Sequence, residues 1–381
     1  MKILQVHNDY IVPGGETRVV ELEKQLLESY GHTVFTYYKS SSEIEGYSLF
    51  DKLRSLFNLF FSYKVYKDVK ERIENDAPDV IHIHNVFPLI SPSVYYIAKR
   101  KRIKIVETLH NFRFLCINGL FFRDGGVCER CPKQSFLHGI KNKCQRNSLF
   151  ISLLYSLNNY AHRLRVFKNG IDAYICLSQF SRNKYIEYGF DESKIFVKPN
   201  FYNQENCDES PVSKNKTILF LGRLEKEKGI ELFINLAVRL PQLKFVVAGT
   251  GSYEERIRSL QLDNLEYKGF VNGKDKDLLI SEATMLVFPS NVYENFPMVV
   301  LEAMKNKTCV CLPKFGSMEE MIEDKKTGFL YRDENELVHL LETYHDQKKM
   351  LSKIESNAYN EFMDKYSSEK NYQMLMQIYT Q

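Results

Sequence analysis

The sequence lacks any apolar run of the roughly 18 to 20 residues that a membrane-spanning helix requires. It also lacks a signal-peptide pattern, because the first predicted strand already starts at Lys2. Hydrophobic residues make up 44% and charged residues 26% of the 381 residues, which excludes a disordered or fibrous chain. We therefore expect a globular protein of two ordinary domains that stays in the cytosol.

Without a secretory signal, the eight cysteines argue against a disulfide framework. Four of them nevertheless cluster: Cys116, Cys128, Cys131 and Cys144. The two-residue spacing of Cys128 and Cys131 lets both thiolates bind one tetrahedral zinc ion. We predict a structural zinc in this glycine-rich segment, with His138 as a substitute ligand. Four reduced, partly buried thiols are the alternative.

The two halves of the chain differ in the sign of their net charge, because acidic residues are fewer in the first half and basic residues are fewer in the second. Residues 1–200 hold 29 Lys and Arg but 20 Asp and Glu, whereas the remainder holds 23 and 28. A basic half favours an anionic partner, such as an anionic membrane face or a lipid-linked phosphate acceptor. A zinc-anchored nucleic-acid-binding protein is an alternative of a different class. We expect no nucleic acid.

The stretch from Lys52 to Arg72 interleaves aromatic and aliphatic residues with lysine and arginine, as an interfacial amphipathic helix does. A surface helix packed on the core is the alternative. A short positive patch follows at Lys99–Arg102. We predict a peripheral protein at the inner face of the plasma membrane.

Apolar runs alternate with helical patterns along the chain, which predicts parallel sheets with crossover helices. Residues 199–213 are polar and form the expected domain linker. The predicted strands are 3–6, 34–37, 80–84, 103–108, 173–176 and 195–198 before the linker, and 217–221, 244–248, 265–268, 285–288, 308–312 and 328–331 after it. The sequence thus predicts an α/β fold of two facing, doubly wound domains. Because ligands of such sheets bind beyond the carboxyl ends of the strands, we expect the site in a deep cleft between the domains.

A strand near the end of the chain runs into an acidic loop and a helix. Glu294 precedes the helix, Pro297 suits its first turn, and Glu302 lies inside it. The unpaired amides of the first turn favour a phosphate, and the two carboxylates can accept hydrogen bonds from hydroxyl groups. This combination predicts binding of a phosphorylated sugar or a nucleotide-sugar.

A second motif runs from Thr217 to Gly229, with Gly222 and Arg223 after a strand and Lys228 before a helix. Arg and Lys can stabilise the negative charge that grows on a leaving phosphate. The Asp275 and Asp277 pair has the spacing of metal-binding carboxylates, but it lies at a predicted helix start, where acidic residues complement the dipole. We therefore predict no catalytic metal.

Together the two motifs resemble those of family-four retaining glycosyltransferases of the GT-B fold, in particular the bacterial capsule, O-antigen and exopolysaccharide type with a Cys-rich insertion. The resemblance implies two Rossmann-like domains: an acceptor-side domain over 1–199 with a Cys-rich insertion at 112–147, and a nucleotide-sugar-binding domain over 200–365. A helix at 366–381 would return to the first domain. The implied activity is transfer of a hexose from a nucleoside-diphosphate sugar to a hydroxyl of a saccharide or lipid-linked acceptor, with retention of configuration.

The resemblance also assigns roles in the second domain. Glu294 would accept hydrogen bonds from the donor sugar close to the reaction, and Glu302 would bind the ribose hydroxyls. The amides of Asn295 and Phe296 would contact phosphate. Asn295 stands where many relatives have glycine, and asparagine tolerates a left-handed conformation better than most residues.

In the first domain, Gly14 and Gly15 resemble the family's glycine loop near the donor phosphates, where glycine permits close approach of the backbone. His110, at the end of a predicted strand, matches a family histidine near the 6-hydroxyl of the sugar. It would orient the donor or stabilise developing charge, and a buried structural histidine is the alternative. His82 and His84 are expected to line or pack the site. A sugar-nucleotide 2-epimerase shares the fold and is the alternative enzyme.

Overall fold

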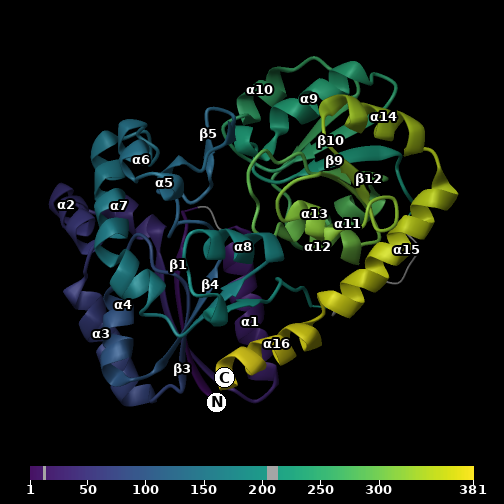
Figure 1. Cartoon of the computed structure of the whole chain (residues 1–381). Helices are drawn as coiled ribbons and strands as arrows, with labels where there is room; N and C mark the ends of the chain where they lie inside the picture. Colours follow the sequence, from purple (N-terminus) through teal and green to yellow (C-terminus); the bar gives the residue numbers. More distant parts are fainter. Residues whose placement is uncertain (12–13, 204–212) are drawn as a thin grey trace. The chain divides into compact units, whose positions relative to one another are not determined.

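The structure is a computed structural model that describes residues 1–11, 14–203 and 213–381. It comprises two compact units, each built around its own parallel sheet (Figure 1). Unit 1 contains Met1–Phe121, Cys128–Asn200 and Asn371–Gln381, and unit 2 contains Phe122–Val127 and Phe201–Lys370. The division thus groups a short piece of the Cys-rich segment with unit 2 and the end of the last helix with unit 1.

The sheet of unit 1 has the order β2-β1-β3-β4-β7-β8, and all its strands pair in parallel. Its strands are β1 (Lys2–Asp9), β2 (Thr33–Ser40), β3 (Val80–Asn85), β4 (Lys104–Leu109), β7 (Ala173–Cys176) and β8 (Ile195–Val197). The central strands β3 and β4 are buried on both faces, as expected of a sheet covered by crossover helices, although each also holds polar residues. The strand order reverses between β1 and β3, where ligands of such sheets commonly bind.

The main helices of unit 1 are α1 (Gly15–Ser29), α2 (Leu49–Asn58), α3 (Tyr63–Asp76), α4 (Ser93–Lys101), α7 (Leu149–His162) and α8 (Gln179–Glu187). The short elements are η1 (Ser41–Gly46), α5 (Arg130–Lys133), α6 (Leu137–Lys141), the π-helical η2 (Arg163–Lys168) and η3 (Glu192–Lys194). Helix α16 (Ser368–Thr380) supplies Leu375, Ile378 and Tyr379 to the core beneath the sheet. Two further strands, β5 (Phe122–Arg123) and β6 (Gly126–Val127), form an antiparallel hairpin.

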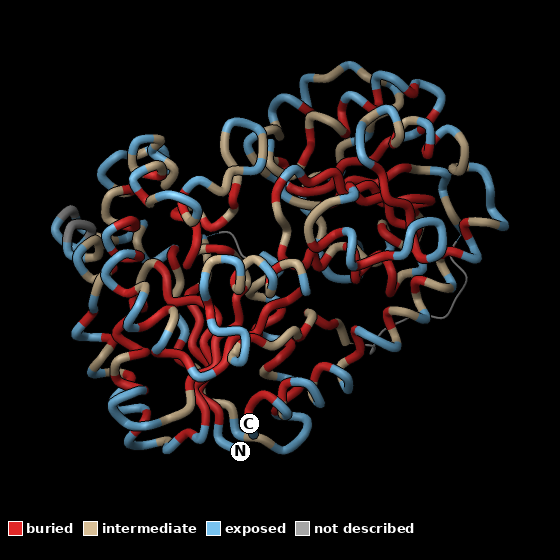
Figure 2. The backbone as a smooth tube through the Cα atoms, viewed as in Figure 1, coloured by how far each residue is buried: buried red, intermediate tan, exposed pale blue. Residues whose placement is uncertain are grey.

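The sheet of unit 2 has the order β11-β10-β9-β12-β13-β14, again with parallel pairing. Its strands are β9 (Thr217–Leu221), β10 (Lys244–Ala248), β11 (Leu265–Gly269), β12 (Met285–Val287), β13 (Cys309–Pro313) and β14 (Phe329–Tyr331). Its helices are η4 (Lys226–Lys228), α9 (Ile230–Arg239), α10 (Glu254–Ser259), α11 (Gly273–Glu282), α12 (Met298–Lys305), α13 (Met318–Met321), α14 (Glu334–Tyr344) and α15 (Lys348–Lys365). Figure 2 shows the buried strands of each sheet beneath helices whose outer faces are exposed. The strand order of this sheet reverses between β9 and β12.

All twelve predicted strands are confirmed, with boundaries that differ by at most a few residues. Most of the linker predicted over 199–213 lies outside the described residues. The prediction of one amphipathic helix over Lys52–Arg72 was wrong, because α2 ends at Asn58 and α3 begins at Tyr63. Ser62 starts the second helix, since its hydroxyl accepts a hydrogen bond from the Val65 amide. Within the described residues, no helix is both long and apolar enough to cross a bilayer.

Candidate functional site

In unit 2 a glycine fixes the position of the predicted lysine. Gly229 has a φ of +76°, and a Cβ atom on it would lie 1.8 Å from the Pro289 carbonyl oxygen. Only glycine fits this conformation and this close approach. The amide of Asn291 also donates to the Glu227 carbonyl oxygen at 2.9 Å. The loop after β9 is thereby held against the loop after β12, at the carboxyl ends of two neighbouring strands.

Lys228 and Glu294 meet in this corner. The Lys228 Nζ atom lies 2.6 Å from Glu294 Oε1, and both side chains are mostly buried. The Ser290 hydroxyl donates to the same carboxylate oxygen at 2.6 Å. The hydroxyl of Ser317 donates to the Glu294 backbone carbonyl. A cation and an oriented carboxylate are therefore fixed side by side at the point where the strand order of unit 2 reverses.

The second predicted cation lies further out. Arg223 is 53% exposed at its side chain, and its Nη2 atom is 3.6 Å from Glu227 Oε1. Glu227 is in turn the residue whose carbonyl accepts from Asn291. Arg223 thus belongs to the same pair of loops as Lys228, but its exposed fork is not fixed by burial. The predicted pair of cations thus consists of one mostly buried group, Lys228, and one exposed group, Arg223.

The start of α12 lies next to Glu294, as predicted. Pro297 is the residue directly before the first turn, with a φ of −69°. Phe296 is buried and packs edge-on against Tyr366, with ring centroids 5.4 Å apart. Asn295 is also buried, and it is not among the described residues with positive φ. The tolerance of asparagine for a left-handed conformation is therefore not used at this position.

Glu302 lies on α12, and only 8% of its side chain is exposed. Burial raises its pKa, and the attraction of Lys276 opposes this effect. The Lys276 Nζ atom, on α11, lies 2.6 Å from Glu302 Oε1. Lys276 was not among the predicted site residues, although it stands between Asp275 and Asp277. Asp275 does lie in the first turn of α11, as predicted.

In unit 1 the predicted residues lie at the carboxyl ends of β1, β3 and β4. Gly14 precedes α1 in an extended conformation, and Gly15 is the first residue of that helix. His110 follows β4, and its Nε2 atom lies 3.0 Å from His84 Nδ1. Burial and the neighbouring His84 hold the pKa of His110 well below its usual range. Both histidines line a small pocket that also contains Asn111 and Arg113.

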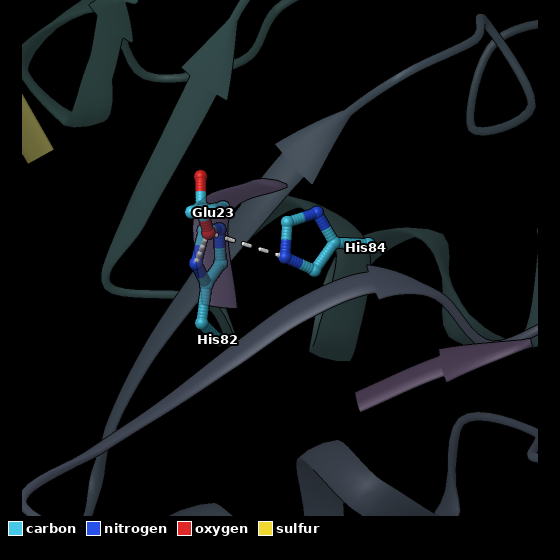
Figure 3. Close-up of side chains that lie close together, drawn as sticks. All are labelled: Glu23, His82 and His84. Carbon is cyan, nitrogen blue, oxygen red and sulfur yellow. Dashed lines mark ion pairs between the residues drawn. The ribbon is translucent and has the colours of Figure 1, made fainter. Parts of the chain in front are cut away.

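Glu23, His82 and His84 form a buried cluster beneath this pocket (Figure 3). Glu23 Oε1 lies 2.8 Å from His82 Nδ1 and 3.4 Å from His84 Nε2. Among the described residues, this is the one group that brings three potential metal-ligand atoms within 4.8 Å of one another. The geometry alone would suit a metal ion.

The surroundings of the cluster favour an ion-pair network instead. The Lys198 Nζ atom lies 3.2 Å from Glu23 Oε2 and already supplies a cation. Both ring nitrogens of His82 have further partners, Tyr379 at 2.7 Å and Thr108 at 2.8 Å. A divalent ion would be repelled by Lys198 and would displace these hydrogen bonds. We interpret the cluster as the polar core that joins α1, β3 and α16.

The four predicted zinc ligands are free thiols in the structure. The hydrogen bond with Cys131 lowers the pKa of Cys116, and backbone amides, including that of Phe121, lower it further. The same hydrogen bond raises the pKa of Cys131. A Cβ on Gly139 would lie 3.3 Å from Cys131 Sγ, and the Cys144 amide donates to the Gly139 carbonyl. Cys116, Cys131 and Cys144 thus lie in the same region, but their sulfur atoms are not all within 4.8 Å of one another. A zinc ion here stays a prediction.

Comparison with known proteins shows the family. The family description "Glycosyltransferase Family 4" matches residues 12–206, which is half of the chain. The chain belongs to this family. A second description, "Glycosyl transferases group 1", matches residues 203–361. The predicted family and glycosyltransferase activity are thereby confirmed.

The glycosyltransferase has several curated relatives. An uncharacterized 41.2 kDa protein in the cps region of Klebsiella pneumoniae is 24% identical over 74% of this chain and 75% of its own length. The alpha-monoglucosyldiacylglycerol synthase of Streptococcus pneumoniae is 24% identical over 84% of this chain and 71% of its own. The alignments with two further relatives span 64% and 62% of those proteins.

Solved structures of low sequence identity show the same fold. Anabaena HepE, crystallised with UDP-glucose, has a TM-score of 0.68 and 19% identity, and the match covers all of both chains. Sucrose-phosphate synthase of Thermosynechococcus elongatus has a TM-score of 0.71 and 15% identity, over all of this chain and 98% of the other. The predicted GT-B architecture of two Rossmann-like domains is confirmed.

Proposed function

We propose that this glycosyltransferase moves a hexose from a nucleoside-diphosphate sugar to a hydroxyl of a saccharide or lipid-linked acceptor, with retention of configuration. The observation that carries the proposal is the contact of Lys228 with Glu294 beside the start of α12. Breaking the anomeric bond puts negative charge on the leaving phosphate, and a fixed cation next to helix amides stabilises that charge. Glu294 would accept hydrogen bonds from the donor sugar at the same place.

We further propose that the diphosphate is held without a divalent metal. Lys228, the exposed fork of Arg223 and the first amides of α12 supply positive charge. The Asp275 and Asp277 pair is engaged elsewhere, since Asp277 accepts a hydrogen bond from Asn306 at 3.2 Å. Retention would follow front-face departure and attack, in which the leaving phosphate helps to deprotonate the acceptor. His110, neutral at physiological pH, would orient the donor sugar through a hydrogen bond.

A panel of nucleotide-sugars tests the donor. The melting temperature of the full chain is measured with UDP-, GDP-, ADP- and dTDP-sugars, and we expect one base to raise it. UDP-sugars come first, because HepE binds UDP-glucose. The Lys228→Ala variant should lose the shift. The proposal would be contradicted if no donor raised the melting temperature, either with magnesium or with a chelator present. Nuclear magnetic resonance of the product then reports the anomeric configuration.

The lipid-linked acceptor is supported by an exposed apolar face on unit 1. We define this face by Phe50, Phe57, Phe61 and Tyr63 of α2, α3 and the segment between them, and by Leu149, Phe150, Leu157, Tyr160 and Leu164 of α7 and η2. Asn158 of α7 donates to the Leu59 carbonyl at 2.6 Å, so the two sets of helices are in contact. Exposed basic residues, including Arg54, Lys64 and Arg165, border it. Apolar and basic groups together fit an anionic lipid surface.

Flotation with vesicles tests this surface. We expect the full chain to float with vesicles of phosphatidylcholine and phosphatidylglycerol, but not with phosphatidylcholine alone. The double variant Phe50→Ser, Phe57→Ser should stay in the soluble fraction. Leu278→Ser removes an exposed apolar residue of unit 2 and serves as the control. If the double variant floats as the wild type does, the apolar face is not the binding surface.

We also propose that Cys116, Cys128, Cys131 and Cys144 hold a structural zinc. The support is the lowered pKa of Cys116, because the thiolate is the form that binds metal. The ion would supply a cross-link for a segment with little regular structure of its own.

A further inference from the structure

Arg113 is a half-buried cation that forms no ion pair among the described residues. It follows β4, and its Nε atom is buried and makes no hydrogen bond within the described part of the chain. The guanidinium lies between the rings of Phe87 and Tyr155, with centroids at 5.7 and 5.6 Å. None of the ion pairs among the described residues includes it. A charge that is partly removed from water normally has a counter-charge nearby, because its desolvation is unfavourable.

The carboxyl groups nearest to Arg113 do not supply a fixed negative charge. Glu107 lines the same pocket, but burial raises its pKa well above the usual range, and Tyr95 donates to it at 2.9 Å. Burial also raises the pKa of Glu16 to about 7. The ion pair that Glu16 does form is with His7, whose Nδ1 atom is 3.7 Å from its Oε1. Among the described residues, the lining of this pocket therefore holds a guanidinium and no carboxylate that forms an ion pair with it.

Tyr10 lies beside the pocket and shares a hydrogen bond with the Arg113 side chain, whereas Asn111 lines the pocket itself. Burial raises the pKa of Tyr10 to about 12, so that its hydroxyl keeps its proton. Asn111 Nδ2 lies 3.3 Å from that hydroxyl, and its Oδ1 fixes the loop by accepting from the Arg113 amide at 3.0 Å. His110 lies in the same wall. An arginine with neutral donors around it is suited to a planar oxyanion.

We propose that this pocket, lined by His84, His110, Asn111 and Arg113, binds an oxyanion on the acceptor. The group is a carboxylate of an acidic sugar or a phosphate of a sugar phosphate or lipid-linked sugar. The inference rests on the proposed function, because it names the acceptor of the same transfer. The binding of an acidic acceptor would complete the charge balance that the chain leaves open around Arg113.

Binding of three small probes to the full chain tests the proposal. The probes are methyl glucuronide for the carboxylate, glucose 1-phosphate for the phosphate and methyl glucoside as the neutral reference, each measured by calorimetry. We expect one anionic probe to bind at least about tenfold more tightly than the neutral one. The anion that binds identifies the source. Equal binding of all three probes would overturn the proposal.

Two variants and one control locate the effect. Arg113→Gln should abolish the preference for the anion and leave binding of the nucleotide-sugar unchanged. Arg100→Gln, on the exposed end of α4, should keep the preference. Glu16→Gln should strengthen anion binding above neutral pH several-fold, because it removes a competing carboxylate, and this variant decides if Arg113→Gln does not fold. An unchanged preference in either variant would overturn the proposal.

The readouts separate this inference from the proposed function. If no nucleotide-sugar binds the wild type, the donor proposal fails whatever Arg113 does. If nucleotide-sugars bind but neither anionic probe is preferred, only the acceptor inference fails. A loss of nucleotide-sugar binding in Arg113→Gln would place this arginine at the donor instead and would also overturn the inference.

Discussion

Lys228 forms an ion pair with Glu294 across 66 positions of sequence, with Nζ and Oε1 2.6 Å apart. The lysine is thus held in place before any phosphate arrives. Ser290 fixes the same carboxylate from the other side. Such preorganisation avoids reorientation of the charge during the reaction.

Replacing either partner should reduce transfer strongly. We expect Lys228→Ala to lower kcat by about 10²- to 10³-fold, the range seen when one preorganised group is removed. Glu294→Gln should also lower it, and the double variant should lose less than the two effects added, because the residues contact each other. Steady-state kinetics measure this. Lys226→Ala, on the exposed side of the same turn, is the control, and undiminished transfer by Glu294→Gln would contradict the site.

The Glu302 and Lys276 pair should separate donor binding from stability. Glu302→Gln should weaken binding of the nucleotide-sugar about tenfold, because a carboxylate accepts more strongly from ribose hydroxyls than an amide does. Lys276→Met should instead lower the free energy of unfolding by about 1 to 3 kcal/mol, since it leaves a buried carboxyl without its partner. Calorimetry and urea unfolding measure the two effects. Lys274→Met changes an exposed lysine two residues before Lys276 and should alter neither donor binding nor stability.

The ion-pair network of Glu23 should make the protein sensitive to acid. Burial opposes ionisation of Glu23, but attraction by His82 and Lys198 outweighs it and lowers the pKa well below 4.5. The resulting stabilisation is present above pH 4.5 and is lost as the pH falls through the lowered value. We expect Glu23→Gln to lower the free energy of unfolding by about 3 to 5 kcal/mol at neutral pH.

The acid limb of this effect has its own control. Urea unfolding is measured from neutral pH downward, and the wild type should lose stability below pH 4.5 more steeply than Glu23→Gln does. Glu21→Gln, also on α1 but 54% exposed, should follow the wild type. Parallel curves for wild type and Glu23→Gln would show that Glu23 is not ionised in the folded protein.

Elemental analysis tests the zinc. We expect about one zinc ion per chain, and Cys131→Ser should lose it and lower the melting temperature. Cys176→Ser changes a cysteine buried in β7 and should keep the metal. Protein purified without chelators that contains no stoichiometric metal would show four reduced thiols instead.

The sequence was sufficient for the strands and for the two motifs, because both depend on local patterns. Apolar runs identify buried parallel strands, and Gly229 and Pro297 mark turns whose backbone needs are specific. The ion-pair partners of the site residues were not predictable in this way. Lys276 reaches Glu302 from another helix, and no periodicity links residues on separate elements.

One wrong prediction has a local cause, and one omission has a non-local cause. The stretch from Lys52 to Arg72 has the composition of one helix, but the hydroxyl of Ser62 caps a new one. The composition outweighed a single capping residue in the prediction. In unit 1, the sequence did not single out Arg113. Its burial between two rings depends on Phe87 and Tyr155, which are 26 and 42 positions away.

The place of α16 has a consequence for synthesis of the protein. Leu375, Ile378 and Tyr379 fill the core under strands from Ile3 to Ile175, and Phe201–Lys370 of unit 2 are made between these strands and the helix. The nascent first sheet therefore has an uncovered apolar patch throughout translation of unit 2, even though domains usually fold in the order of their synthesis. Chaperones that hold nascent chains would have their target there, until the arrival of this helix closes it.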